Sequence, residues 1–319
     1  MQSYLLRDHK RGAKIETISR PTPKTGEILL QIHACALNFA DLLMLEGRYQ
    51  DMPERPFAPG MEVAGTVAAL GPGVTGPAVG SRVAMFTGSG GLAEYGCFPA
   101  ERAVVLPDAT GFEAAAALQI AHGTSHLALT HRVAVQPGET LVVLGAAGGT
   151  GLGAVEVGRR LGARVIACAR GREKIALAQK AGAHQTIDTQ SADLRTRLLA
   201  LGCCDVVYDP LGGDLFTAAS RACNPLARIL SIGFASGEIP PIPANHLMVK
   251  NISVLGFYWG GYLKFAPELV RNSLGTLFDW QARGEISPHI SQTLPLSEVA
   301  AGLDLLRQRR ATGKVVITP

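Results

Sequence analysis

The stretch TLVVLGAAGGTGLGAVEVGRRLGARVIACAR, residues 140–170, determines the fold of this chain. It begins with an apolar strand, passes through a glycine-rich turn, continues with helical periodicity and ends in a second apolar strand. A wholly apolar strand is typical of a parallel sheet covered on both faces. A glycine turn between such a strand and a helix directs backbone N–H groups at the helix N-terminus, where an anion such as a pyrophosphate binds. The stretch therefore predicts a nucleotide-binding βαβ unit.

The glycines of this turn depart from the most common spacing. In one frame Ala146 takes the place of the first glycine, whereas residues 149–154 fit the form G-x-G-x-x-A. A glycine pattern alone is a weak signal, but a strand before it and a helix after it make it more specific. A tight turn that binds no ligand is the alternative interpretation.

The end of the second strand bears on the choice of nucleotide. In NAD-binding proteins an Asp or Glu at this point binds the ribose 2′-hydroxyl. Here the strand ends in Ala169 and is followed by Arg170, Arg172 and Lys174. Cationic donors of this kind suit a 2′-phosphate, so the sequence favours NADPH. The alternative is a solvated helix start, where Glu173 alone would suit the helix dipole.

The rest of the chain indicates two kinds of domain. Residues 1–110 read as short strands separated by Gly and Pro, which suits a compact β domain. From about residue 112, helical and strand patterns alternate, as in a parallel sheet with crossover helices. An apolar strand closes the chain and is expected to return to the first domain. The sequence thus predicts a discontinuous catalytic β domain, 1–118 and 261–319, interrupted by a nucleotide-binding domain, 119–260.

Composition narrows the possible functions. The chain has 319 residues, of which 47% are hydrophobic and 18% charged, with a formal net charge of +4. This balance predicts a globular protein and gives no reason to expect a specific nucleic-acid partner. No apolar run has the length of a membrane span. The six cysteines form no C-x-x-C pair, which favours a reducing, cytoplasmic setting over a disulfide framework.

Four segments together resemble the zinc-independent quinone oxidoreductases, the zeta-crystallin-like members of the medium-chain dehydrogenase/reductase superfamily. They are ACALNFADLLMLEGRY (34–49), PGMEVAGTV (59–67), GAAGGTGLGAVEVGRRLGARVIA (145–167) and RRATGKVVITP (309–319). The resemblance covers nearly the whole chain. It implies an α/β protein with a chaperonin-10-like β-barrel catalytic domain and a Rossmann domain, a doubly wound parallel sheet, usually assembled as a homodimer.

The resemblance also suggests a role for the segment PGMEVAG, residues 59–65. In zinc-dependent relatives a Gly-His-Glu sequence stands here, and its His binds catalytic zinc. Met61 takes that place, and Asn38 replaces a ligand Cys. His122 is the only possible ligand in the helical lead-in, and catalytic zinc needs three protein ligands. We therefore expect no metal, with Met61 as apolar filling and Glu62 as a structural hydrogen-bond acceptor.

The resemblance implies roles for a set of cofactor-binding residues. Asn38 and Thr124 should lie near the nicotinamide or its ribose. The pyrophosphate should be held by Gly148, Gly149, Thr150 and Gly151, and the 2′-phosphate by Arg170, Arg172 and Lys174. Lys314 should reach the phosphates from the last strand. The cofactor channel should be lined by Gly233, Phe234, Phe257 and Tyr258.

Two further positions concern the substrate and the 2′-phosphate. Tyr49 is the candidate for substrate contact, since its phenol can donate to a quinone oxygen, although an ordinary loop tyrosine is the alternative. Thr189 stands near the position where the family often has a tyrosine or another polar residue that helps to bind the 2′-phosphate. Asp41 suits a structural hydrogen-bonding role better than that of a base.

The function expected from these residues is hydride transfer from NADPH to a quinone or another conjugated carbonyl, without zinc. Such acceptors need positioning and a hydrogen-bond donor, while the cofactor supplies the difficult chemistry. Two alternatives are an NADPH-dependent enoyl-thioester reductase and a non-catalytic NADPH-binding stress protein. The segment NISVLGFYWG, residues 251–260, reads as a long apolar edge strand, and we expect it to pair with its copy across a two-fold axis.

Overall fold

The structure is a computed structural model that describes all 319 residues. It divides into two compact units, the first made of Met1–Ile120 and Leu274–Pro319 and the second of Ala121–Ser273. The boundaries expected from the sequence lie after residues 118 and 260. The first unit is therefore built from both ends of the chain, and the second is inserted between them.

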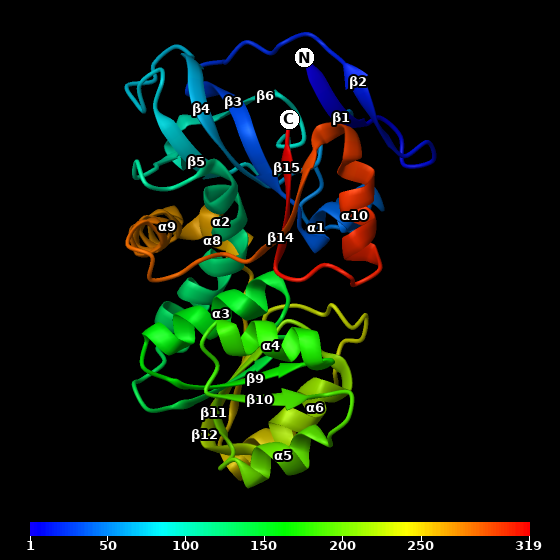
Figure 1. Ribbon diagram of the computed structural model, residues 1–319, viewed down its shortest axis with the longest axis vertical. Coiled ribbons are helices and arrows are strands. Elements are labelled where there is room, and N and C mark those ends of the chain that lie inside the picture. The colour runs from blue at the N-terminus through cyan, green and yellow to red at the C-terminus, as the bar shows by residue number, and fades with distance from the viewer. The chain divides into compact units, whose positions relative to one another are not determined.

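The first unit consists mainly of β-structure (Figure 1). Its main sheet has seven strands in the order β14-β15-β3-β4-β5-β7, with β6 paired to β3, and β1 and β2 form a separate pair. The strands are β1 (Gln2–Leu6), β2 (Ala13–Thr17), β3 (Glu27–Ala36), β4 (Glu62–Leu70), β5 (Arg82–Phe86), β6 (Tyr95–Pro99), β7 (Val104–Val105), β14 (Ile290–Pro295) and β15 (Lys314–Thr318). Helical segments of this unit are α1 (Phe39–Leu45), η1 (Ala100–Arg102), η3 (Leu296–Glu298) and α10 (Val299–Arg307).

The last strand returns to the first domain, as the sequence predicted. In β15, Val316 lies opposite Ala36 of β3 in an antiparallel pair. The first four residues of β15 are buried. The two ends of the chain therefore share one sheet, which brings the start of β15 beside the end of β3.

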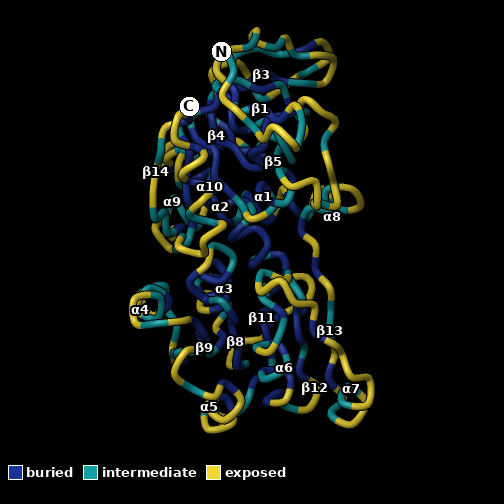
Figure 2. Tube along the Cα trace, turned by 90° about the vertical axis from the view of Figure 1, so that its right-hand side faces the viewer, coloured by how far each residue is buried: buried dark blue, intermediate teal, exposed yellow.

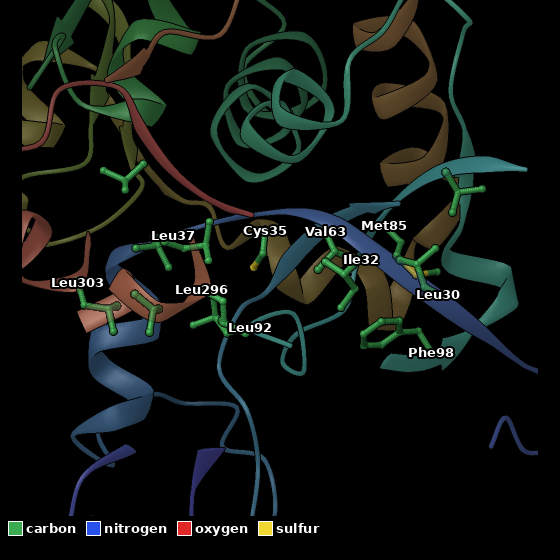
Figure 3. Close-up of a cluster of buried hydrophobic side chains, with 14 of the residues drawn as sticks. Leu30, Ile32, Cys35, Leu37, Val63, Met85, Leu92, Phe98, Leu296 and Leu303 are labelled. Atoms are coloured by element: carbon green, nitrogen blue, oxygen red, sulfur yellow. The ribbon is translucent and has the colours of Figure 1, made fainter. Parts of the chain in front are cut away.

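The core of this unit follows the pleat of β3 (Figure 3). Ile28, Leu30 and Ile32 alternate into the core, as a period of two requires. The register with β4 then shifts between Ile32 and Ala34, after which Cys35 and Leu37 face the core instead. A bulge of this kind redirects every following side chain to the opposite face. It determines which way the residues at the end of β3 point.

The second unit contains a six-stranded, wholly parallel sheet in the order β10-β9-β8-β11-β12-β13. Numbered from β8, this is the order 3-2-1-4-5-6 of a dinucleotide-binding sheet. The strands are β8 (Thr140–Leu144), β9 (Arg164–Ala169), β10 (Gln185–Asp188), β11 (Cys204–Asp209), β12 (Cys223–Ser231) and β13 (Ser253–Gly256). The predicted Rossmann domain is confirmed, and with the β domain it gives the expected α/β fold.

Helices cover both faces of this sheet (Figures 1 and 2). On one face, α5 and α6 pack through Leu198 and Phe216 onto strand residues such as Val142 and Ile166. On the other, α3 approaches so closely that a Cβ at Gly158 would lie 2.4 Å from the Leu141 side chain. The helical segments are α3 (Gly149–Arg160), α4 (Arg172–Lys180), α5 (Leu194–Ala200), α6 (Gly213–Arg221), α7 (Ala244–Lys250), α8 (Trp259–Phe265) and η2 (Ala128–Arg132); α2 (Phe112–Leu127) and α9 (Pro267–Ala282) run across the unit boundaries.

Two element boundaries differ from the sequence expectation. The alanine-rich segment LFTAASRACNPLA, residues 215–227, favours a helix over its whole length, yet α6 ends at Arg221 and β12 begins at Cys223. Pro225 explains the early end, because a proline disfavours helical backbone in the residue before it. The strand expected over 251–260 is confirmed at the sheet edge but is wrong in its length, since β13 ends at Gly256 and α8 begins at Trp259.

Candidate functional site

The glycine turn joins β8 to the N-terminus of α3. Gly145 has a φ of +63°, which favours glycine, and its carbonyl accepts the Gly148 N–H at 3.0 Å. A Cβ at Gly151 would lie 2.3 Å from the Gly145 oxygen, so only glycine allows the helix to start this close to the strand. A Cβ at Gly148 would meet nothing nearer than 3.5 Å. Packing within the protein therefore requires Gly151 to be glycine but leaves open space at Gly148.

A buried hydrogen-bond network holds this turn on its interior side. The Ser125 hydroxyl of α2 donates to the Thr150 carbonyl at 2.8 Å and also contacts the Tyr208 hydroxyl of β11 at 3.1 Å. Tyr208 is fully buried, and this burial raises the pKa of its phenol. Sequence reasoning missed both residues, because neither lies in a motif and their proximity depends on three elements far apart in the chain.

The turn after β9, Arg170–Lys174, is called here the cationic turn. Arg170 and Arg172 are exposed, and Lys174 is partly buried. A carboxylate beside it was missed in the sequence. Oδ1 of Asp188, at the end of β10, accepts the Gly171 and Gln190 N–H groups at 3.0 Å each, and these bonds lower the pKa of Asp188. A carboxylate therefore lies beside the cationic turn, where it holds the backbone of the turn, although no acid ends β9 itself.

Other predicted residues of the second unit differ in exposure. Thr189 donates its hydroxyl to the Ala169 carbonyl at 3.3 Å. Phe234 and Tyr258 are 42% and 40% exposed, whereas Phe257 is buried with its ring 5.2 Å from that of Tyr262. Phe257 is therefore held in the packing of its own unit, and the two exposed rings remain the candidates for ligand contact. Three more predicted residues lie in this unit, namely Thr124, buried in α2, Gly149, which begins α3, and Gly233, which follows β12.

Four side chains of the first unit form what we call the buried charge cluster, Asn38, Asp41, Glu62 and Lys314. The Lys314 ammonium donates to the Leu37 carbonyl at 2.8 Å, to Asn38 Oδ1 at 2.7 Å and to Glu62 Oε1 at 2.7 Å. All three ammonium protons are thereby bound by protein oxygens. This arrangement does not support the expectation that Lys314 holds the cofactor phosphates, because no proton is left to donate.

The carboxylates of the cluster are also satisfied within the protein. Glu62 is fully buried and accepts the Asn38 amide at 2.9 Å and the Ile120 N–H at 2.6 Å, which confirms its expected role as a structural acceptor. Asp41 is fully buried and accepts the N–H groups of Asn38 and Gly60 at 2.8 Å each. Desolvation raises the pKa of Asp41 to about 6, although these two N–H donors and Lys314 act to lower it.

Three further sequence candidates, Met61, His122 and Tyr49, make contacts of their own or lie in a loop. Met61 is buried, and its carbonyl accepts the Thr87 N–H at 2.7 Å. His122, in the second unit, pairs with Glu156 of α3 at 2.6 Å. No group of three or more His, Cys, Asp or Glu side chains is arranged to hold a metal ion. Tyr49 is partly buried in the segment after α1.

Comparison with known proteins agrees with the fold and the two motif regions. Residues 24–108 match the family model described as alcohol dehydrogenase GroES-like domain, and residues 149–274 match zinc-binding dehydrogenase. The chain is 38% identical over 299 residues to quinone oxidoreductase-like protein 2 homolog of Nematostella vectensis, covering 92% of this chain and 82% of that one. It is 36% identical to quinone oxidoreductase-like protein 2 of Bos taurus, covering 99% and 92%.

A solved structure shows the same arrangement of elements. The quinone oxidoreductase of Thermus thermophilus, described with its NADPH complex, superposes over 100% of both chains with a TM-score of 0.87 and 33% identity. The chain therefore belongs to the quinone oxidoreductase family of the medium-chain dehydrogenase/reductase superfamily, a class of oxidoreductases. None of its helices combines the length and apolar character that crossing a membrane requires.

Proposed function

We propose that this protein reduces a quinone or another conjugated carbonyl compound with NADPH as the hydride donor. The observation that carries the proposal is the pairing of an open glycine turn at a helix N-terminus with a cationic turn at the end of the next strand. The first feature suits a pyrophosphate and the second a 2′-phosphate. The NADPH complex of the Thermus relative supports the same choice.

The residues present fit this cofactor. The space at Gly148 allows a phosphate to approach the backbone, and the first N–H groups of α3 lack partners within the helix. Ala169 removes the acid that would repel a 2′-phosphate at the usual ribose position, while Arg170 and Arg172 offer exposed guanidinium groups. Gly148 to Gly151 would hold the pyrophosphate, with Arg170, Arg172 and Lys174 around the 2′-phosphate.

NADPH supplies a hydride when bound, and the acceptor also takes a proton from the medium. The chain's task is to orient the acceptor and to stabilise charge on its oxygen. Asn38 and Thr124 remain our proposals for the nicotinamide end, and Tyr49 remains the proposed substrate contact. The exposed rings of Phe234 and Tyr258 offer flat surfaces for an aromatic ligand.

The test is NADPH consumption with three acceptors, a benzoquinone, a short enone and a crotonyl thioester. We expect turnover with the quinone or the enone and much less with the thioester. Preference for the thioester would establish the enoyl-thioester reductase instead. NADPH binding without consumption of any acceptor would leave a non-catalytic nucleotide-binding protein and contradict the proposal.

Assembly as a homodimer is part of the same proposal. β13 lies at the sheet edge, where unpaired backbone groups favour pairing with another chain. Large apolar side chains are exposed in the preceding segment, including Ile239, Met248 and Val249. Light scattering at micromolar concentration should give twice the chain mass, and the chain mass itself would contradict this. Six free cysteines suit the reducing cytoplasm that we propose as its location.

A further inference from the structure

The Lys314 ammonium is surrounded in the way a small cation is surrounded by ligands. Three oxygens of three kinds, a backbone carbonyl, an amide and a carboxylate, lie 2.7 to 2.8 Å from Nζ. Lys314 is 6% exposed and its partner Glu62 is fully buried. The two residues are 252 positions apart in the sequence, so the ion pair joins the last strand to the start of β4.

The burial of Glu62 decides whether this ammonium is free to move. If Lys314 turned away toward a cofactor phosphate, the Glu62 carboxylate would remain buried and would lose its only cationic partner. Breaking a buried pair in this way is strongly destabilising, because the remaining charge stays out of water. A contact with a partly exposed phosphate would gain less than this loss. The pair therefore holds Lys314 in place.

The ion pair also fixes the amide of Asn38. Oδ1 faces the Lys314 ammonium, while Nδ2 donates to Glu62 Oε1 and to the Ala36 carbonyl. A flipped amide would place its NH₂ group against the ammonium and its oxygen against the carboxylate, and both contacts would be repulsive. The backbone N–H of Asn38 is held separately by Asp41. Asn38 thus has one permitted orientation, set by two opposite charges.

We propose that Lys314 is a positioning residue, an internal cation that together with Glu62 orients Asn38 for hydride transfer and holds no phosphate of the cofactor. This inference rests on the proposed function, in which Asn38 acts at the nicotinamide end. It predicts that loss of the pair lowers kcat and leaves the affinity for NADPH nearly unchanged. A phosphate contact predicts the reverse, a weaker affinity with kcat kept.

The test compares Lys314→Met, Glu62→Met and the double variant, with Lys24→Met, an exposed lysine of the same unit, as control. Each single change leaves one buried charge without its partner and should lower the unfolding midpoint. The double variant removes both charges and should regain much of the lost stability, since apolar replacement of a buried pair is often tolerated. The unfolding midpoint shows whether the double variant is folded, and the kinetics of the folded variant separate a positioning role from a merely structural one.

For the double variant we expect kcat to fall about tenfold or more, with the NADPH dissociation constant within about threefold of wild type. A smaller fall in kcat would overturn the proposal. A rise of about tenfold or more in the NADPH dissociation constant would indicate that Lys314 contacts the cofactor phosphates, and it would overturn the proposal. If the wild type consumes no NADPH with any acceptor, the fluorescence of bound nicotinamide decides: a changed emission at unchanged affinity supports the inference, and an identical emission overturns it.

Discussion

The buried charge cluster and the cationic turn both carry opposite charges, yet they satisfy them differently. In the cluster, Lys314, Glu62 and Asp41 are almost fully buried, and each is paired by several protein groups. In the cationic turn, Arg170 and Arg172 extend into solvent beside the Asp188 carboxylate. Partners in the first region come from the protein, whereas the partner of Arg170 and Arg172 is expected to be a ligand.

A substitution in the buried charge cluster should therefore change stability, whereas a substitution in the cationic turn should change ligand affinity. Removing a group from the cluster leaves a buried partner unsatisfied, so the free energy of unfolding should respond. Removing an exposed cation of the turn, Arg170 or Arg172, leaves no buried charge behind, so stability should be nearly unchanged. Its effect should appear in the affinity for a phosphorylated nucleotide.

The largest effect is expected from the double change Arg170→Ala with Lys174→Ala. Each charge-assisted contact to a partly exposed phosphate contributes about 1 to 2 kcal/mol. Losing two should weaken NADPH binding by roughly 30- to 1000-fold, because each 1.4 kcal/mol is about tenfold. NADH lacks the 2′-phosphate and should be barely affected. Dissociation constants for both nucleotides, measured by nicotinamide fluorescence, check this.

Steady-state kinetics and thermal unfolding of the same double variant give two further readouts. The Michaelis constant for NADPH should rise while turnover at saturation is largely kept, since the contact is remote from the hydride. The unfolding midpoint of the double variant should stay close to that of wild type. Equal affinity of the wild type for NADH and NADPH would contradict the charge argument, and so would full NADPH preference in the double variant.

The next effect concerns pH and belongs to the buried charge cluster. The pKa of Asp41 is raised from 3.8 to about 6, so the folded protein holds this proton more tightly than the unfolded chain does. Stability from this group is therefore fully present below pH 3.8 and is lost as pH rises through about 6. A shift of this size corresponds to about 3 kcal/mol.

The measurement is the free energy of unfolding of wild type and Asp41→Asn across this pH range. Asparagine cannot titrate, so the wild type should lose stability relative to the variant as pH rises from about 4 to about 6. Asp108→Asn, at an exposed aspartate of the same unit, is the control. A relative gain for the wild type over that range would show that the two N–H donors and Lys314 outweigh desolvation.

The two regions also differ in how much of each could be predicted from the sequence. The strand, glycine turn, helix and cations at 140–174 are local signals, so the Rossmann domain could be predicted from their order along the chain. The buried charge cluster depends on residues 38, 62 and 314, and no local pattern reports their contact. Glu62 is indicated as an acceptor by the resemblance, which also places Lys314 at the cofactor phosphates. The ion pair between the two side chains joins positions 252 residues apart, so no local pattern could show it.

Element boundaries failed for a related reason. Residues 251–260 are apolar throughout, and an apolar run does not show where a strand ends and a helix begins. The structure places that change after Phe257, whose N–H makes the last bond to Ser231 of β12, at 3.0 Å. Asp188 could not be recognised from the sequence around β9, because it comes close to the turn only through the parallel pairing of β10 with β9, in which Asp188 lies opposite Ala169.

A matched pair of glycines separates packing from binding within the nucleotide-binding unit. Gly151→Ala would force a Cβ to within 2.3 Å of the Gly145 oxygen, and the backbone must shift. We expect a loss of about 2 kcal/mol of stability. Gly148→Ala meets no close neighbour and its φ of −80° suits alanine, so it should fold normally. Its cost should appear only as weaker NADPH binding, because the methyl group would occupy the space proposed for the phosphate.

Thermal unfolding and nucleotide titration of both variants provide the check. Gly151→Ala should lower the unfolding midpoint by several degrees, which is roughly what 2 kcal/mol implies for a domain of this size. Normal stability of Gly151→Ala would mean that the turn adjusts easily. Unchanged NADPH affinity of Gly148→Ala would mean that the phosphate does not approach the backbone there, and the proposed role of the turn would fail.

The smallest effect is expected at Asp188, which shares one feature with each of the two regions. Its carboxylate is fixed by Gly171 and Gln190 like a member of the cluster, yet it lies at the solvent edge beside the cationic turn. Because these N–H donors lower its pKa, it stays ionised at neutral pH and would oppose the binding of a 2′-phosphate at the proposed site. Asp188→Asn keeps an acceptor for the Gly171 N–H and removes the charge.

NADPH affinity of Asp188→Asn should therefore rise by about threefold, a small effect because solvent screens the charge, while NADH affinity stays within error. Asp214→Asn, an exposed aspartate on α6, controls for net charge. The gain should shrink as salt is added, since screening removes a purely electrostatic effect. Weaker NADPH binding that does not depend on salt would instead show that Asp188 acts by holding the turn in shape. In that case the Asp188 carboxylate would act by fixing the backbone of the cationic turn, as Glu62 and Asp41 fix the backbone around them. The two regions would then differ only in how far their charges are exposed to solvent.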